Sequence, residues 1–125
     1  MKLFDFAIII ALGSAFTFTG GAEFFFSAPK HKFPDTQAGV QLTHDYVFTN
    51  AGDEPLIISE YKVACSCTKV DFPEEPIAPG KSGVIKLTFD TTGKYGLQNR
   101  KIDLYSNASQ SPYSLTFKVY VISNE

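Results

Sequence analysis

The stretch ACSCTKVDFPEEPIAPGKSGVIKLTFD, residues 64–90, decides the fold of this 125-residue chain. It contains both cysteines, Cys65 and Cys67, and ends in the clearest strand pattern of the sequence. Its prolines fix φ and remove backbone donors, so residues 73–79 are expected to form a stiff loop that turns at Pro79-Gly80. Residues 83–90 then alternate apolar and polar side chains, as half-buried strands do. The stretch therefore predicts a strand, a rigid crossover and a second strand.

The remaining sequence repeats the period of two in short segments. Phe24, Phe25 and Phe26 precede two prolines and indicate a first strand at a sheet edge. The pattern slips by one residue near Ser59-Glu60, which predicts a β-bulge. The other expected strands are residues 40–50, 56–63, 100–106 and 113–122. In the first of these the predicted inward face is Val40, Leu42, His44, Tyr46 and Phe48.

Fold class follows from this organisation. After the first 22 residues no segment has apolar side chains at helical spacing, and turn signals separate the short strands. A chain of this length, with 44% hydrophobic and 19% charged residues, has room for one globular core. We therefore expect one all-β domain, built as a β-sandwich.

Several motifs give the chain a family resemblance. They are FTNAGD at residues 48–53, PLII at 55–58, CSCT at 65–68, PIAPGKSG at 76–83 and YSN at 105–107. With them the sequence resembles a bacterial family known as a domain of unknown function, DUF1573, akin to the ASPM/SPD-2/Hydin modules. The family usually has Ser-Cys-Gly-Cys where this chain has Ala64-Cys65-Ser66-Cys67. The resemblance implies an immunoglobulin-like β-sandwich of about seven antiparallel strands and an exported protein, without naming an activity.

The first 22 residues have the organisation of a signal peptide. Lys2 supplies a positive start, residues 6–18 are uncharged and mostly apolar, and Gly20-Gly21-Ala22 offers small residues for cleavage. The alternative, a membrane anchor, requires ~20 strongly apolar residues, more than this segment has. We expect a signal peptide at residues 1–22, a mature domain at 23–125 and no stable membrane span after cleavage. The mature domain would then be periplasmic, cell-surface or secreted.

The net charge and the absence of known catalytic and ligand-binding motifs argue against several classes of function. The net charge is −2, and Lys and Arg are scattered singly along the sequence, so we expect no nucleic-acid partner. The sequence also lacks a nucleophile elbow, a phosphate-binding glycine loop and a calcium loop. We expect no enzyme activity and no cofactor.

The two cysteines, Cys65 and Cys67, form either a disulfide or a pair of free thiols. In a regular strand, Cys65 and Cys67 would point to the same face with Cα atoms about 6.6 Å apart and Cβ vectors nearly parallel, which does not suit a disulfide. Either the chain bends at Ser66 and closes a small bridge, or both thiols stay free as a two-sulfur chelate for copper or zinc. An oxidising compartment favours the bridge.

The two histidines are the further metal candidates. His44 is expected on the inward face of its strand, more simply as a partly buried, hydrogen-bonded side chain than as a ligand beside Cys65 and Cys67. His31 lies between two lysines and two prolines, and we expect it to be solvated.

Two hypotheses for function follow. The preferred one is a non-catalytic exported domain that binds a protein or cell-envelope partner through loops or an open sheet edge. The alternative is a thiol-based metal-binding or redox protein that uses Cys65 and Cys67. The state of the two sulfur atoms distinguishes them.

Overall fold

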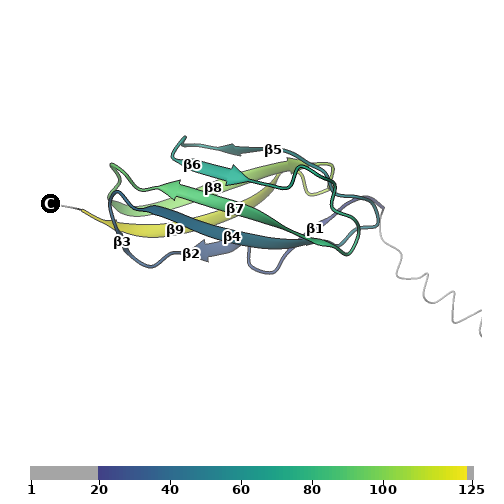
Figure 1. Ribbon diagram of the computed structural model, residues 1–125, viewed down its shortest axis with the longest axis horizontal. Helices are drawn as coiled ribbons and strands as arrows, with labels where there is room; N and C mark the ends of the chain where they lie inside the picture. The colour runs from purple at the N-terminus through teal and green to yellow at the C-terminus, as the bar shows by residue number, and fades with distance from the viewer. Residues whose placement is uncertain (1–19, 124–125) are drawn as a thin grey trace, which may run out of the picture.

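A computed structural model describes residues 20–123 of the chain as a β-sandwich (Figure 1). The prediction of an all-β fold is confirmed, but the described residues form nine strands, more than the seven expected. The strands are β1 (Phe24–Phe26), β2 (Lys30–Lys32), β3 (Thr36–Gln37), β4 (Gln41–Asn50), β5 (Ile58–Val63), β6 (Thr68–Asp71), β7 (Ser82–Asp90), β8 (Gly96–Ser106) and β9 (Tyr113–Ile122). The described residues contain no helix long and apolar enough to cross a membrane.

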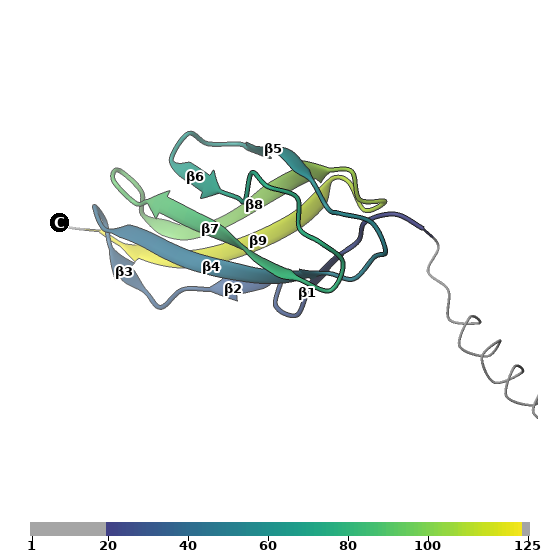
Figure 2. The same cartoon turned by 45° about the vertical axis from the view of Figure 1, so that its right-hand side comes forward.

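The strands form two sheets that pack face to face (Figures 1 and 2). Sheet I has the order β1-β4-β7-β6, and sheet II has the order β2-β9-β8-β5, with β3 also paired to β9. Four strands in sheet I thus pack against five in sheet II, two strands more in total than in an immunoglobulin constant-type sandwich. β5 and β6 lie along one margin of the sandwich, and β1, β2 and β3 lie along the other.

The amino-terminal segment changes sheets at Pro29. β1 pairs with β4 in sheet I, whereas β2 and β3 pair with β9 in sheet II and run parallel to it. The sequence predicted only one strand here, and an entirely antiparallel sandwich. Prolines interrupt the ladder and limit the segment to short strands, which form the edges of both sheets at this margin.

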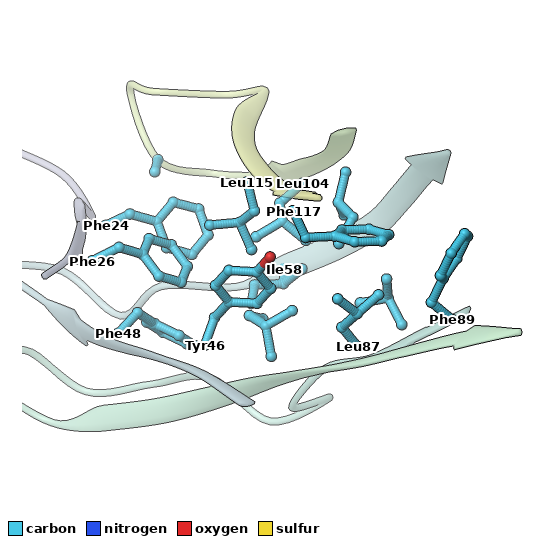
Figure 3. Close-up of a cluster of buried hydrophobic side chains, with 14 of the residues drawn as sticks. Phe24, Phe26, Tyr46, Phe48, Ile58, Leu87, Phe89, Leu104, Leu115 and Phe117 are labelled. Carbon is cyan, nitrogen blue, oxygen red and sulfur yellow. The ribbon is translucent and has the colours of Figure 1, made fainter. Parts of the chain in front are cut away.

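The core is built by the inward side chains of both sheets (Figure 3). The alternation predicted for β7, β8 and β9 is confirmed, since Ile85, Leu87 and Phe89 are fully buried, as are their neighbours from sheet II. Burying one such side chain contributes about 1.5–3 kcal/mol. Val40 is an exception: it precedes β4 and is 42% exposed, so the predicted inward face begins at Leu42.

The predicted bulge is confirmed. The pairing of β5 with β8 shifts between Ile58 and Glu60, at the position where the hydrophobic pattern slips. Ile58 before the bulge and Tyr61 after it both point inward. β5 therefore keeps its core contacts along its length, although the alternation of inward and outward side chains shifts by one residue.

Asn50 fixes the end of β4. Its side chain is buried and its Oδ1 accepts from the backbone N–H groups of Glu23 at 3.2 Å and Gly52 at 2.9 Å. Its Nδ2 donates to the carbonyls of Glu54 at 2.7 Å and Ile77 at 2.9 Å. One amide therefore joins the amino-terminal segment, the turn after β4 and the proline-rich loop.

The predicted signal peptide lies almost entirely outside the described residues, and its cleavage stays a prediction. Ala22, the last residue assigned to it, is 3% exposed and belongs to the core. Gly21 exchanges hydrogen bonds with Asp53, with its N–H donating to Oδ1 at 2.8 Å and its carbonyl accepting from the Asp53 N–H at 2.9 Å. The folded part therefore includes residues that a cleavage after Ala22 would remove.

Candidate functional site

The two cysteines lie in a turn that connects the sheets. β5 ends at Val63 in sheet II and β6 begins at Thr68 in sheet I, so residues 64–67 must cross from one sheet to the other. The Thr68 N–H donates to the Cys65 carbonyl at 3.1 Å, which closes the turn. The strand expected at residues 56–63 does end at Val63, whereas β6 was not predicted.

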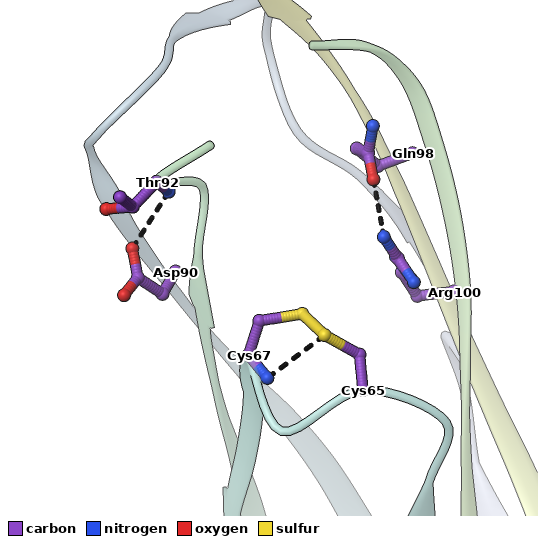
Figure 4. Close-up of a disulfide and its surroundings, with 6 residues drawn as sticks. All are labelled: Cys65, Cys67, Asp90, Thr92, Gln98 and Arg100. Carbon is purple, nitrogen blue, oxygen red and sulfur yellow. Dashed lines mark hydrogen bonds between the residues drawn. A yellow bond between two sulfur atoms is a disulfide. The ribbon is translucent and has the colours of Figure 1, made fainter. Parts of the chain in front are cut away.

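Cys65 and Cys67 are joined by a disulfide, with Cα atoms 5.1 Å apart (Figure 4). That Cα distance is shorter than the ~6.6 Å between alternate residues of a regular strand, so the chain bends between the two cysteines, as the first of the two alternatives requires. The Cys67 N–H also donates to the Cys65 Sγ at 3.1 Å. Figure 4 shows the bond between two segments, Asp90–Thr92 at the end of β7 and Gln98–Arg100 in β8.

The turn forms one wall of a surface hollow of about 410 Å³, named the cysteine hollow below. It lies where the turn leads the chain away from β8: the last β5–β8 pair is Val63 with Ile102, and the next residues of β8 have no β5 partner. The hollow is lined by Lys62, Val63, Ala64, Cys65, Thr68, Asn99, Arg100, Lys101 and Asp103.

Arg100 is the side chain of this hollow with the least satisfied polar group. Its Nη2 donates to the Oε1 of Gln98 at 2.6 Å, and its guanidinium lies 5.6 Å from the ring centroid of Phe89. Its Nε is buried and has no hydrogen-bond partner within residues 20–123. An unsatisfied buried donor costs free energy.

A second hollow of about 440 Å³, named the lysine hollow below, lies on the neighbouring part of sheet II. It is lined by Lys30, His31, Lys32, Asn99, Thr116, Phe117 and Lys118. Asn99 belongs to both hollows, so the two adjoin on the surface of β8 and β9.

The two histidines lie between the sheets at the opposite margin. His31 of β2 stacks on His44 of β4, with ring centroids 3.5 Å apart and planes 11° from parallel. Burial lowers the pKa of both, and the nearby His31 lowers the pKa of His44 further, against the opposing effect of Asp45. The prediction for His44 is confirmed as to partial burial. His31, which was expected to be solvated, is half-buried: β2 carries it into this stack, and it also lines the lysine hollow.

The candidate metal ligands are not brought together. Cys65 and Cys67 are bonded to each other, and the ring contacts of His44 are with His31, Phe33 and Tyr46. Within residues 20–123, no three His, Cys, Asp or Glu side chains form a group that could hold a metal ion. Copper or zinc binding through Cys65, Cys67 and His44 has no geometric support among these residues.

The cationic residues that line the hollows were not among the predicted site residues. The alternation places Lys30 and Lys32 on one side of an extended segment, and Lys101 and Lys118 on the polar sides of their strands. The outward position of these lysines could therefore be read from the sequence. Their proximity depends on the parallel pairing of β2 with β9, which no local pattern in the sequence indicates.

Fold and family can now be assigned. The two packed sheets define an all-β domain with an immunoglobulin-like sandwich fold. The model of the family described as "Protein of unknown function (DUF1573)" matches residues 24–121, so the chain belongs to that family. No curated protein sequence matches the chain.

Solved structures share the fold at low identity. A protein of unknown function from Porphyromonas gingivalis superimposes with a TM-score of 0.69 and 16% identity, covering 85% of this chain and 50% of that chain. The VesB protease of Vibrio cholerae gives 0.59 and 10%, covering 95% and 35%. The ASH/PapD-like domain 7 of human CEP192 gives 0.57 and 14%, covering 82% and 86%. This chain thus spans half or less of the two bacterial proteins.

Proposed function

We propose that this chain is an exported, non-catalytic binding domain that recognises a protein or another component of the cell envelope. The observation that carries the proposal is the turn at residues 64–67, which the Cys65–Cys67 bond closes and which walls a solvent-open hollow. A fixed turn beside a hollow is a preorganised binding feature, and preorganisation lowers the entropy lost on binding.

The chemistry of the reactive side chains supports a non-catalytic role. Both sulfur atoms are used in the disulfide, so neither is a nucleophile in this state. The two histidines stack on each other and contact aromatic rings, and burial favours their neutral forms. A general base needs a positioned proton acceptor beside a nucleophile. Neither histidine has that arrangement within residues 20–123.

Export is part of the proposal. The leader-like sequence at residues 1–22 and a closed disulfide both fit an oxidising compartment outside the cytoplasm.

The binding surface we propose is a face and a turn, not the open edge considered from the sequence. The two sheets have edges at both margins: β1, β2 and β3 at one margin are only two or three residues long, and β5 and β6 form the edges at the other. β5 carries a bulge and the charged Glu60 and Lys62, and β6 has only four residues before Pro73. Bulges, charges, short length and proline are the features that protect edge strands from pairing.

The test is affinity capture of the tagged full chain from the envelope of cells that produce it. A stoichiometric partner that survives washing at moderate salt is expected, and absence of any retained component from wild-type chain would overturn the binding function. The matched variant is Cys65→Ser with Cys67→Ser, which keeps size but opens the turn. It should capture less of the same partner.

A thiol–disulfide role is the second candidate, because both cysteines are only half-buried at the rim of an open hollow. In such a role a partner dithiol would be oxidised while Cys65 and Cys67 become two thiols. The single variant Cys67→Ser distinguishes the candidates. A mixed disulfide trapped between its Cys65 and a partner would favour exchange, whereas capture that resists reductant favours binding.

A further inference from the structure

The positive charges of this acidic chain gather at the two hollows. The cysteine hollow is lined by Lys62, Arg100 and Lys101, and the lysine hollow by Lys30, Lys32 and Lys118. Six of the 11 Lys and Arg residues of the chain therefore line them, against one of its 13 acidic residues, Asp103. The Lys and Arg residues are scattered along the sequence, but the fold brings these six together at the two hollows.

Strand register explains how distant cations meet. Lys32 lies opposite Lys118, and Lys118 lies opposite Asn99, so one row crosses β2, β9 and β8. Lys30 lies opposite Thr116, and Thr116 lies opposite Lys101, which forms the next row on the same face. Neighbouring strands are about 4.8 Å apart and alternate residues about 6.6–6.8 Å apart, so the two rows cover a compact area.

Within residues 20–123, Lys101 is the one cation of the hollows that forms an ion pair, and Lys62 lies over the ring of Tyr105, 5.1 Å from its centroid. Lys101 lies 3.8 Å from Asp103, which is a surface ion pair of small energetic weight. Arg100 has its bond to the neutral Gln98 and an unsatisfied Nε. A concentration of unpaired cations in hollows raises the local positive potential and attracts anionic groups.

We propose that the cysteine hollow and the lysine hollow together form one docking site for an acidic peptide segment of a partner protein. This rests on the proposed binding function and specifies its partner chemistry. Carboxylates match both the guanidinium fork of Arg100 and the ammonium groups of the lysines. Asn99, exposed where the hollows adjoin, offers an amide donor and acceptor to a peptide backbone.

The lining favours a peptide over a single-stranded nucleic acid. Nucleobases are held by exposed aromatic rings on which they stack. The aromatic residue lining these hollows, apart from His31, is Phe117, which is 1% exposed and directed into the core. Recognition here thus depends on charge and hydrogen bonds.

The size of the site sets the length of the segment. Crossing the four strands from β5 to β2 spans about 14 Å, which about four extended residues can cover. A peptide of this length carrying two or more carboxylates can place one near Lys62 or Lys101 and another near Lys118.

The experiment measures fluorescence anisotropy of a labelled peptide of Glu-Ser repeats, about six residues long, with the full chain. The control peptide has Gln in place of each Glu. The test variant is Lys30→Glu with Lys118→Glu, and the matched control is Lys69→Glu with Lys81→Glu, which makes the same change in net charge on exposed residues away from both hollows. Circular dichroism and urea unfolding confirm that each variant is folded.

The wild type should bind the acidic peptide more tightly than the Gln peptide, with affinity falling as salt rises. The test variant should bind about tenfold or more weakly, and the matched control within about twofold of wild type. Equal loss in the two variants, or equal binding of the two peptides, would overturn the docking site. So would tighter binding of an oligothymidylate or an acidic oligosaccharide used at the same charge.

Different results would refute the docking site and the proposed binding function. If the test variant still captures the envelope partner, and the acidic peptide does not bind, the docking site is refuted and the binding function stands. If the wild-type chain captures no partner, the binding function itself is refuted.

Discussion

Replacing Phe89 by Ala should remove a large part of the stability of the sandwich. Phe89 is fully buried in β7, its ring lies 5.1 Å from that of Phe117 in an edge-to-face arrangement, and it supports the guanidinium of Arg100. Phe→Ala changes in cores cost about 3–5 kcal/mol, because transfer free energy and packing are both lost. Phe89→Leu keeps most of the volume and loses mainly the aromatic contacts, so it should cost about 1–1.5 kcal/mol.

The assay is equilibrium unfolding in urea followed by tyrosine fluorescence and far-ultraviolet circular dichroism. With a slope near 2 kcal/mol/M, a loss of about 4 kcal/mol lowers the midpoint by about 2 M. Thr88→Ala is the control, since Thr88 lies on the other face of the same strand, and its midpoint should move by less than about 0.5 M. Similar shifts for Phe89→Ala and Thr88→Ala would refute the assignment of the faces.

Three further predictions concern other parts of the fold. Asn50→Ala should lower the free energy of unfolding by about 3 kcal/mol, because four backbone groups lose their partner, and urea unfolding measures it. Because the pKa values of His31 and His44 are lowered in the folded state, the unfolded chain takes up protons first. Stability should be complete above pH ~6.5 and fall below it, and His31→Phe should reduce this dependence of the urea midpoint on pH. The Cys65→Ser, Cys67→Ser chain should lose only about 1.6 kcal/mol, as expected for so short a loop, and a loss above ~3 kcal/mol would contradict that reasoning.

The sequence predicted those elements whose signals are local. The alternation in β4, β7 and β9 reflects burial on one face, and the slip in β5 reflects the bulge, so both could be read from consecutive residues. Family motifs supplied the immunoglobulin-like topology, and the matching family model confirms that resemblance. The elements that were missed are β2, β3 and β6, which have two to four residues and are too short to show a period.

The candidate site was only partly predictable. The cysteine motif indicated that residues 64–67 differ from a regular strand, and geometry restricted Cys65 and Cys67 to a bend or two free thiols. The cationic face was not predictable, because Lys30 and Lys118 are far apart in sequence and meet only through the parallel pairing of β2 with β9. Parallel pairing of such short strands depends on tertiary packing, which propensity and alternation do not encode.

The most direct test of the central claim is hydrogen–deuterium exchange of the full chain, alone and in complex with the partner captured from the envelope. If the cationic face of sheet II binds the partner, amide exchange should slow in residues 96–101 of β8, in residues 116–118 of β9 and in β2. The strands β4 and β7 of sheet I, which line neither hollow, should be unchanged and serve as the internal control. Slower exchange confined to sheet I or to the loop at residues 72–81 would contradict the claim.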